Sequence, residues 1–346
     1  VYLGRHKLRV GTLASVQLPL GINHLGAATG LRLPARVIMD RRTPEALARH
    51  LADVLADGAS PEGSSAMLGD LYAQARENGT APEFMERLAA AAREREVFTM
   101  PVANDVPESV RLSEGRDGAA LLCFPTVLAT SGPHQYARFA APFVEERDVF
   151  ALSLPGFRDG ERLPASLEAI AEASAEAVRR RADGDPFVLV GYSSGGVIAH
   201  ETVRLLEESG VFPDAVVLLD TYVPGDPALA GAGPALMDGM ARRLTEFGPV
   251  EDARLTAMSG YLRLIEDWQP APVKAPVLLV RPLEPVPGMP VTEGAGEDSG
   301  WASSWQHAHG LAAVPGDHFS MIEEHAADTA RTVGAWLSSL KTRERA

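Results

Sequence analysis

The sequence predicts an α/β fold in which helices cover both faces of a mostly parallel β-sheet. From about residue 118, short runs rich in valine and leucine alternate with helical stretches, notably 166–181 and 194–208. Parallel strands require crossover connections of this kind, and strands buried on both faces are apolar throughout. One run also ends in a serine between glycines, which is typical of a sharp strand-to-helix turn. The expected strands are residues 119–124, 148–152, 187–190, 215–219 and 276–280.

Composition narrows the class of protein. The chain has 346 residues, of which 46% are hydrophobic, enough for a sizeable core. Its net charge of −14, with basic residues scattered along the chain, argues against nucleic acid or an anionic membrane as a partner. No apolar run approaches the roughly 20 residues of a membrane span, and no export signal is evident, so a cytoplasmic location is expected. Cys123 is the only cysteine, which excludes an internal disulfide, and no metal site is expected.

Residues 1–57 are predicted to form a block of their own. Thr43 can cap a helix whose first position is Pro44, and apolar side chains then recur at helical spacing. The next residues, 58–63, are rich in glycine, serine and proline, the composition of a flexible linker. A domain boundary is therefore expected there, with the main domain spanning 64–346.

Two short helices are expected at the start of the main domain, within residues 64–97. Apolar residues repeat at helical spacing on both sides of Asn78 and Gly79, which together form a stop signal. A pair of short helices has little stability by itself. It must therefore pack on the rest of the domain or on a second copy of the chain, and the second arrangement would make a homodimer.

Residues 187–196 carry a pattern typical of a catalytic serine. An apolar strand leads to Gly191, Ser193 and Gly195, and an amphipathic helix follows. A serine exposed on so tight a turn needs neighbours without side chains two positions away. The amino end of the helix points at the serine, where free N–H groups can stabilise an oxyanion. The pattern predicts Ser193 as a nucleophile.

A serine nucleophile needs an acid and a base, in the chain order serine, acid, histidine for this kind of sheet. Asp220 closes the strand 215–219 and opens a loop. Its rivals Asp214 and Asp226 lie at the start of the strand and well into the loop. Asp220 is the predicted acid, although an aspartate at this place can also simply cap the turn.

His318 is the predicted base among nine histidines. It follows a short strand-like run and precedes the last helix, for which Ser320 and Glu323 are expected to form a capping box. His307 and His309 are weaker candidates, because no strand delivers them to the edge of the sheet. The histidines set aside because they precede the linker or lie in predicted helices are His6, His24, His50, His200 and His325.

Two backbone N–H groups are expected to hold the oxyanion. One is that of Ser194, directly after the nucleophile. The other should come from the loop after the first strand, where Val127 is preferred and Thr126 is the alternative. His134, further along this loop, either lines the mouth of the pocket or packs within the loop.

A long insertion is expected between the fourth and fifth strands, at residues 225–270. It has no strand pattern, and its apolar residues repeat at helical spacing in two groups, 237–247 and 255–265. Ligands of open α/β sheets bind beyond the carboxyl ends of the strands. The insertion is therefore expected to form a lid over that edge.

Several stretches carry a resemblance to a known family. They are Ser131-Gly132-Pro133-His134, Pro186-Phe187-Val188, residues 217–222, residues 252–257 and residues 314–321. With these motifs, residues 64–340 resemble the terminal thioesterase domains of modular type I polyketide synthases, whereas a generic esterase would share only the nucleophile turn. The resemblance implies an α/β-hydrolase fold, a homodimer formed through the helices within 64–97, and a channel under the lid at 225–270.

The resemblance also implies the substrate and the partner. A finished polyketide chain would arrive on the phosphopantetheine of an acyl carrier protein and pass from that thioester to Ser193, and the thioesterase itself would need no cofactor. Side chains expected to line the substrate pocket are Thr126, Tyr192, Tyr222, Met258 and Tyr261.

Two departures from the family pattern stand out. Residues 26–55 resemble the C-terminal half of an acyl carrier protein, yet the Asp-Ser-Leu that carries phosphopantetheine is absent. Residues 1–57 are therefore interpreted as a truncated or disordered remnant, or C-terminal part, of such a carrier. At the nucleophile turn, Tyr192 and Ser194 stand where histidine and alanine are usual, and a Ser194 hydroxyl there can help to place water.

Release of the acyl chain has two possible outcomes. Water at the acyl-enzyme gives a linear acid, whereas a hydroxyl of the chain itself gives a macrolactone. Hydrolysis is favoured because Arg242, Arg243 and Arg263 lie among the apolar residues of the predicted lid. The alternatives are a stand-alone or editing thioesterase or esterase of the same fold, and a binding module that has lost the chemistry.

Overall fold

A computed structural model gives the fold of the domain. It describes residues 2–3, 6–7, 71, 74–75, 77–116, 118–247, 250–289 and 300–343. The predicted carrier-like block at 1–57 and the linker at 58–63 therefore lie outside the described residues, apart from one antiparallel pair, β1 (Tyr2–Leu3) and β2 (His6–Lys7). Of the two helices predicted within 64–97, the second is α5 (Ala81–Arg93), and the first lies mostly outside the described residues.

The domain is built around a seven-stranded sheet with the strand order β11-β10-β9-β8-β5-β6-β4. All neighbouring strands pair in parallel except β4 and β6, so the predicted mostly parallel sheet is confirmed. The strands are β4 (Ser109–Ser113), β5 (Ala120–Phe124), β6 (Val149–Leu152), β8 (Phe187–Tyr192), β9 (Ala215–Leu219), β10 (Val277–Pro282) and β11 (Gly310–Val314).

The edge strand β4 was not predicted. Its residues alternate between polar and apolar, and its first three positions are not fully buried, unlike the strands at the centre of the sheet. An edge strand has one neighbour and a partly solvated face, so it lacks the continuous apolar run that marks a buried parallel strand. The antiparallel pairing with β6 closes this edge of the sheet.

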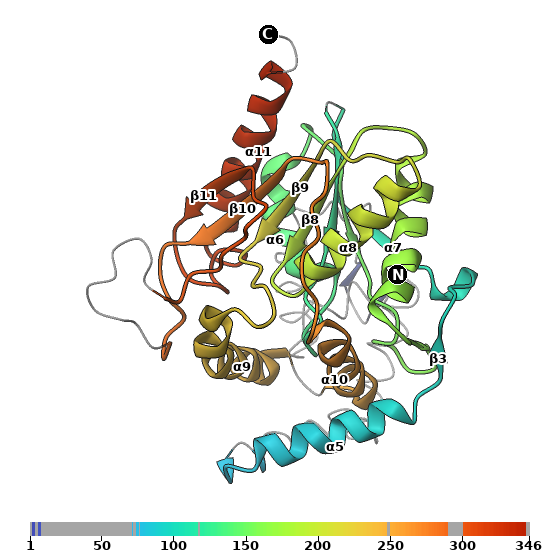
Figure 1. The fold of residues 1–346 in the computed structure, drawn as a ribbon, viewed down its shortest axis with the longest axis vertical. Helices are drawn as coiled ribbons and strands as arrows, with labels where there is room; N and C mark the ends of the chain where they lie inside the picture. The colour runs from blue at the N-terminus through green and yellow to red at the C-terminus, as the bar shows by residue number, and fades with distance from the viewer. Residues whose placement is uncertain are drawn as a thin grey trace.

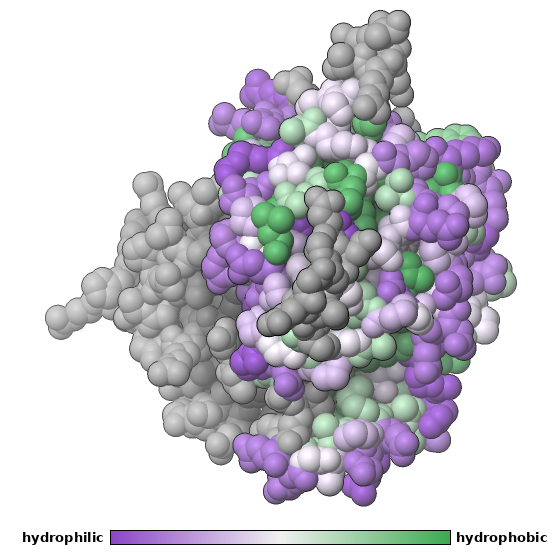
Figure 2. Space-filling model, turned by 60° about the vertical axis from the view of Figure 1, so that its left-hand side comes forward, coloured by the Kyte–Doolittle hydropathy of each residue, from purple (hydrophilic) through white to green (hydrophobic). Residues whose placement is uncertain are grey.

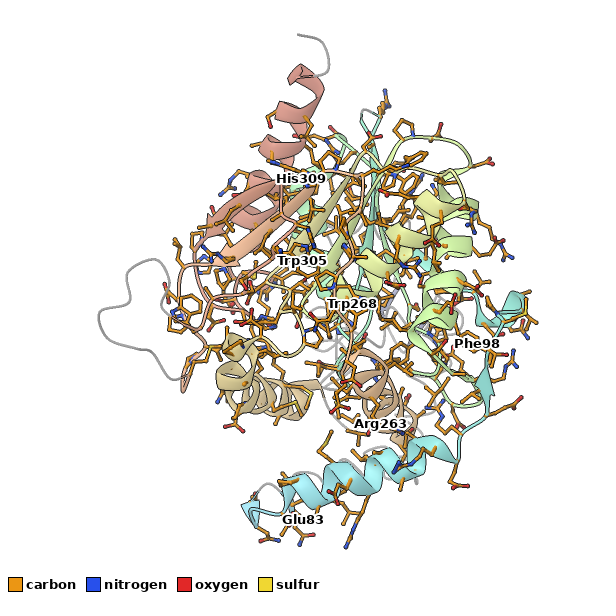
Figure 3. The ribbon with its side chains drawn as sticks, viewed as in Figure 1. Glu83, Phe98, Arg263, Trp268, Trp305 and His309 are labelled. Carbon is orange, nitrogen blue, oxygen red and sulfur yellow. The ribbon has the colours of Figure 1, made fainter. Side chains whose placement is uncertain are left out.

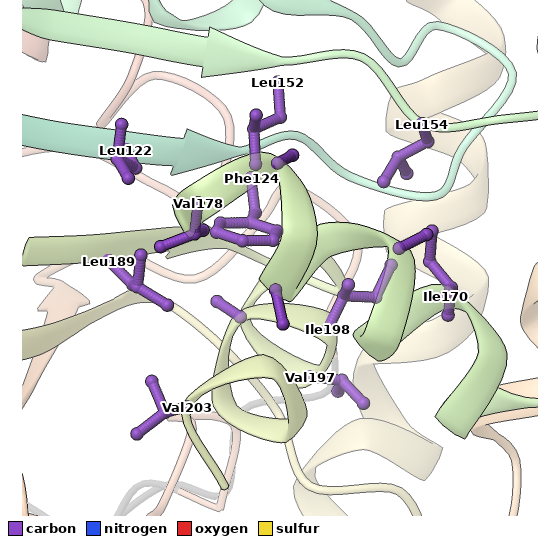
Figure 4. Close-up of a cluster of buried hydrophobic side chains, with 14 of the residues drawn as sticks. Leu122, Phe124, Leu152, Leu154, Ile170, Val178, Leu189, Val197, Ile198 and Val203 are labelled. Atoms are coloured by element: carbon purple, nitrogen blue, oxygen red, sulfur yellow. The ribbon is translucent and has the colours of Figure 1, made fainter. Parts of the chain in front are cut away.

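Helices cover both faces of the sheet, as predicted (Figure 1). On one face lie α7 (Leu167–Ala182) and α8 (Gly195–Glu208), and on the other α6 (Ala137–Ala140) and α11 (Ala326–Arg343). Successive side chains of β5 point to opposite faces. Leu122 and Phe124 pack with α7 and α8 (Figure 4), whereas Leu121 and Cys123 pack with α6 and α11. Each fully buried leucine of this kind contributes roughly 2 kcal/mol of transfer free energy.

The helix α7 shows how local sequence sets an element's ends. The Ser166 side chain accepts a hydrogen bond of 3.1 Å from the Ala169 N–H, which satisfies one of the free donors of the first turn. At the other end Asp183 adopts a left-handed conformation with φ of 47°, and its N–H bonds the Arg179 carbonyl. Both ends agree with the predicted helix at 166–181.

The insertion at 225–270 contains two helices and no strand, as predicted. They are α9 (Pro227–Phe247) and α10 (Asp252–Ile265), which follow the carboxyl end of β9 (Figure 1). The helix α5 packs on α10. Arg95, just after α5, fixes this contact by donating to the Ala253 carbonyl at 2.9 Å and to the Glu161 carbonyl at 2.7 Å.

The remaining described elements are short. They are the parallel pair β3 (Val97–Phe98) and β7 (Leu163–Pro164), and the 3-10 helices η2 (Ala103–Asp105), η3 (Pro133–Tyr136) and η4 (Ala141–Phe143). On the face drawn in Figure 2, hydrophilic residues alternate with small hydrophobic groups. Within the described part of the chain, no helix is long and apolar enough to cross a membrane, and no group of acidic, histidine and cysteine side chains could hold a metal ion.

Candidate active site

Ser193 lies on the turn between β8 and α8 in a strained backbone conformation. Its φ is 53°, in the left-handed region that a serine rarely adopts. The turn is possible because the flanking glycines carry no side chain, which lets their backbone pack directly against other backbone atoms. A Cβ on Gly191 would lie 2.3 Å from the Gly196 Cα, and one on Gly195 would lie 2.3 Å from the Pro125 oxygen. The tight turn therefore requires residues without side chains two positions from Ser193, as the sequence predicted. It leaves the Ser193 side chain partly exposed.

Asp220 is fully buried at the carboxyl end of β9. Its backbone is also left-handed, with φ of 42°, and its N–H bonds the Val280 carbonyl of β10. One carboxylate oxygen, Oδ1, accepts a 2.7 Å hydrogen bond from the Ser303 hydroxyl. The rival Asp226 instead caps α9, because its Oδ1 accepts from the Ala228 N–H at 2.8 Å.

Ser303 is a site residue that sequence reasoning missed. It is fully buried and lies 83 positions from Asp220 in the chain, in a loop before β11. A single serine in a loop gives no pattern to detect. The neighbouring Trp301 carbonyl accepts a 2.8 Å hydrogen bond from Tyr222, which fixes the same loop beside the carboxyl end of β9.

His318 reaches Asp220 from the loop after β11. Its ring is 2% exposed, and its Nδ1 lies 2.7 Å from the second carboxylate oxygen, Oδ2. The Tyr192 ring stacks on the imidazole with centroids 5.1 Å apart, and its hydroxyl donates to the His318 carbonyl at 2.8 Å. Burial raises the pKa of Tyr192 well above its usual value of 10, so the phenol stays neutral and acts as a donor. These contacts fix both the ring and the backbone of His318.

The predicted capping box of Ser320 and Glu323 is not formed, and this expectation was wrong. The Ser320 hydroxyl accepts from the Asp317 N–H at 2.8 Å, and the Asp317 carboxylate accepts from the N–H groups of Phe319 and Ser320. This local network holds the chain in turns, so α11 begins only at Ala326, after His325. The network therefore shapes the loop that carries His318 rather than the start of a helix.

The structure brings the predicted serine, acid and histidine to one edge of the sheet. The Ser193 N–H donates to the Leu219 carbonyl at 2.8 Å, which places the nucleophile turn directly beside Asp220. Among the described residues, the Ser193 hydroxyl has no hydrogen-bond partner. The hydrogen bond between a catalytic nucleophile and its base is often long in the absence of substrate and shortens in the complex.

The loop from Pro125 to Gln135, called here the oxyanion loop, lies against the nucleophile turn. The Val127 N–H donates to the Ser194 Oγ at 3.0 Å, whereas the Thr126 N–H donates to the Gln135 side chain at 3.1 Å. The Thr126 N–H is thus engaged within its own loop, and the Val127 N–H points at the residue after the nucleophile. Of the two donors that the sequence left open, this geometry favours Val127.

The five side chains predicted to line the pocket are all buried, but they separate into two groups. Tyr192 and Tyr222 contact the His318 ring, with centroids 5.1 and 6.4 Å away, and Thr126 lies in the oxyanion loop. Met258 and Tyr261, on α10, are fully buried in the hydrophobic clusters that this helix shares with its neighbours. The Tyr261 hydroxyl donates to the Pro155 carbonyl at 2.9 Å. The structure therefore brings three of the five to the site, and the other two pack within the core.

Each helix of the insertion is tied to one part of the site. On α9, Arg243 pairs with Glu323 at 2.6 Å and lies over the Phe319 ring, 3.9 Å from its centroid, next to His318. On α10, the buried Arg254 donates to the carbonyls of Ala129 and Ser131 in the oxyanion loop. The helices α9 and α10 thus contact the loops that carry the predicted base and the predicted oxyanion donor.

The arginines that favoured hydrolysis do not gather at the nucleophile. Arg243 is held by Glu323, and Arg242 and Arg263 are exposed. Arg263 lies on α10 near the helix α5 (Figure 3). Of these three arginines, Arg243 alone lies beside the loop that carries His318.

A second buried histidine, His200, lies on α8 behind the nucleophile turn. Its ring packs against the edges or faces of Trp268 and Trp305, with centroids 5.4 and 5.3 Å away, and the two tryptophan rings also contact each other at 5.7 Å. Both tryptophans lie near the centre of the view in Figure 3. Neither ring nitrogen has a hydrogen-bond partner in the described structure. Burial lowers the pKa of His200 to about 4, so the ring is neutral at pH 7. It is structural in this environment, in agreement with its exclusion as a base.

A cavity of about 430 Å³ lies beside β10 and β11, away from the nucleophile. Its walls include Arg281, Ser303, Trp305 and His309. His309, one of the weaker candidates for the base, accepts a 3.1 Å hydrogen bond from the Val277 N–H with its Nδ1. The cavity touches the back of the acid through Ser303 but does not include Ser193 or His318.

Comparison with known proteins identifies relatives of this chain. A family model described as thioesterase domain matches residues 119–337. Polyketide synthase GfsE of Streptomyces halstedii is 46% identical over 281 residues, which cover 79% of this chain and 7% of that protein. The spectinabilin polyketide synthase system protein NorC of Streptomyces orinoci is 41% identical over 333 residues, covering 93% of this chain and 14% of that protein. The chain therefore spans about a seventh or less of the length of these relatives.

Solved structures support the same fold. The NocB thioesterase domain from the nocardicin cluster matches with a TM-score of 0.52 and 23% identity, covering 67% of this chain and 99% of that one. The four-domain nonribosomal peptide synthetase holo-AB3403 matches with a TM-score of 0.51 and 18% identity, covering 91% of this chain and 23% of that one. These likenesses confirm the predicted α/β-hydrolase type of fold. The family model, which matches more than half of the chain, shows that the chain belongs to the thioesterase domain family.

Proposed function

We propose that this domain releases a polyketide chain from an acyl carrier protein through a covalent intermediate on Ser193. The observation that carries the proposal is the buried 2.7 Å contact between His318 Nδ1 and Asp220, beside a serine held at φ of 53°. An imidazole fixed in this way by a carboxylate presents its other nitrogen as a base. The polyketide synthase relatives supply the class of substrate.

The proposed acylation uses Ser193 as nucleophile and His318 as base. His318 Nε2 accepts the proton of the Ser193 hydroxyl as Oγ attacks the thioester carbonyl. Asp220 accepts the hydrogen bond from Nδ1–H and stabilises the imidazolium that forms. The oxyanion would lie between the Ser194 N–H and the oxyanion loop at Val127, whose N–H donates to the Ser194 hydroxyl. The proton on Nε2 passes to the departing pantetheine sulfur.

Deacylation repeats the same steps with a different nucleophile. We propose water as that nucleophile, which gives a linear acid, because Ser193 and Ser194 are both partly exposed to solvent. His318 would take a proton from the water and return it to Ser193 Oγ as the ester bond breaks. A hydroxyl of the polyketide in place of water would give a macrolactone by the same proton transfers.

The proposed partner is an acyl carrier protein, in keeping with the multidomain synthases among the relatives. We also propose a homodimer formed through the N-terminal helices, which the resemblance to polyketide synthase thioesterases implies. The described helix α5 buries Phe84, Leu88 and Ala92 on one side, toward α10, and leaves its other side exposed. That exposed side is available to a second copy.

The test is mass spectrometry of the products formed from a long hydroxyacyl N-acetylcysteamine thioester, with Ser193→Ala as the control. We expect a linear acid only from the protein that retains Ser193. A product lighter by one water would show macrolactonisation and overturn the proposed release mode. Equal consumption by both proteins would show that Ser193 is not the nucleophile.

A further inference from the structure

The Ser194 side chain occupies the place next to the nucleophile where an oxyanion is expected to bind. Its Oγ accepts the Val127 N–H at 3.0 Å, the same N–H that is expected to hold the oxyanion. An alanine at this position would place no hydroxyl between that N–H and the reacting carbonyl. In this chain the Ser194 hydroxyl and the oxyanion would compete for the Val127 N–H.

A hydroxyl can accept and donate at the same time, which resolves the competition. It has two acceptor lone pairs and one proton. One lone pair of Ser194 Oγ is used by Val127, and within the described structure the hydroxyl proton has no protein acceptor. Ser194 is partly exposed on the same turn as Ser193, so this proton is free to face the reacting carbonyl.

We infer that the Ser194 hydroxyl is itself a donor in the oxyanion hole, with the Val127 N–H behind it. The inference rests on the proposed function of Ser193. Ser194 would then supply two donors, its backbone N–H at the start of α8 and its O–H. The Val127 N–H fixes the direction of the hydroxyl and polarises it, because hydrogen bonds in a chain strengthen one another. The hydroxyl keeps its proton throughout, and only its hydrogen bond to the developing negative charge strengthens.

The rival arrangement makes the opposite prediction. If the side chain rotated away when substrate binds, the oxyanion would contact the Val127 N–H directly and the hydroxyl would only obstruct it. Removing the hydroxyl would then leave the rate unchanged or raise it. If the hydroxyl is a donor, its removal should lower kcat about 100-fold, at the lower end of the roughly 100- to 1,000-fold loss that follows removal of one oxyanion-hole donor. KM should change little, because the bond forms mainly in the transition state.

The experiment compares three variants with the unaltered chain. Ser194→Ala removes the hydroxyl, Ser194→Thr keeps it, and Ser209→Ala makes the same change at the far end of α8, where the hydroxyl bonds the Leu206 carbonyl. Two rates are measured: kcat and KM for the hydroxyacyl N-acetylcysteamine thioester, and the rate at which a fluorophosphonate labels Ser193. Thermal unfolding by circular dichroism shows whether each variant keeps its fold.

The expected result is a loss in both rates for Ser194→Ala, recovery to within a few-fold for Ser194→Thr, and no change for Ser209→Ala. Rates of Ser194→Ala equal to or above those of the unaltered chain would overturn the inference. An equal loss in Ser194→Ala and Ser194→Thr, with the fold intact, would also overturn it, since the hydroxyl would then not be the cause. Fluorophosphonate labelling of Ser193 does not depend on thioester release. A chain that is labelled but does not consume the thioester would refute the proposed function, and the labelling rates of the variants would still decide the role of Ser194.

Discussion

Acid should destabilise this domain through His200, a buried residue away from the chemistry. Burial beside Trp268 and Trp305 lowers the pKa of His200 to about 4, against about 6.5 for an exposed histidine. Above pH 6.5 the ring is neutral in both folded and unfolded chains. As the pH falls from 6.5 to 4, the unfolded chain binds a proton that the folded chain does not, so stability declines with falling pH.

The size of the effect follows from the pKa difference. Each pKa unit corresponds to about 1.4 kcal/mol, so the shift to about 4 corresponds to a loss of about 3 kcal/mol between pH 6.5 and pH 4. Such a loss is a large part of the roughly 5–15 kcal/mol by which a typical domain is stable. Neither ring nitrogen of His200 has a hydrogen-bond partner in the described structure, and the nearby charge of Glu201 offsets only part of the cost of charging the buried ring.

The assay is urea unfolding followed by circular dichroism between pH 7.5 and pH 4, for the unaltered chain and for His200→Phe. Phenylalanine fills the same place against the two tryptophans and cannot titrate, while every other group is the same in both proteins. The difference in unfolding free energy between the two should therefore shift by about 3 kcal/mol in favour of the variant as the pH falls. A difference in unfolding free energy that stays constant over this pH range would show that folding does not lower the pKa of His200. His200→Leu provides the same comparison if the phenylalanine variant does not fold.

Three further changes test the site. Ser303→Ala removes the hydroxyl bound to Asp220 and should lower kcat about tenfold through poorer orientation of the acid, with KM unchanged in steady-state kinetics; an unaltered kcat would contradict this. Arg254→Met removes the donor to two carbonyls of the oxyanion loop and should lower the free energy of unfolding by about 2–3 kcal/mol in urea. Arg254→Lys should recover part of this loss. A stability of Arg254→Met equal to that of the unaltered chain would argue against the contact. Ser193→Gly relieves the left-handed backbone and should raise the unfolding free energy by about 1 kcal/mol while abolishing activity, whereas lower stability would show that the turn is not strained.

Local patterns determined most of the scaffold. The buried strands β5, β6, β8, β9 and β10 were predictable because each is a short apolar run, and burial on both faces of a parallel sheet requires such a run. The nucleophile turn was predictable because its backbone admits only glycine at the two flanking positions. The two helices of the insertion followed from the 3.6-residue period of their apolar side chains.

Other features were beyond the reach of local patterns. The edge strand β4 has no continuous apolar run, since one side of an edge strand faces solvent. The motif of Ser320 and Glu323 predicted a helix start, but Asp317 competes for the Ser320 hydroxyl and holds the chain in turns. A short motif cannot show which of two nearby polar partners takes a hydroxyl, because the outcome depends on the path of the loop.

The class of fold, the order of serine, acid and histidine, and the resemblance to polyketide synthase thioesterases could all be predicted from the amino-acid sequence. The contacts that support those residues could not be predicted, because they join segments that are distant in the chain. The Ser303 hydroxyl donates to Asp220, 83 positions away in the chain. The Val127 N–H donates to the Ser194 hydroxyl at the nucleophile turn, whereas the Thr126 N–H donates within its own loop. The physical reason is that hydrogen bonds between distant segments depend on where the sheet brings loops together, and no periodicity or spacing along the chain records that meeting.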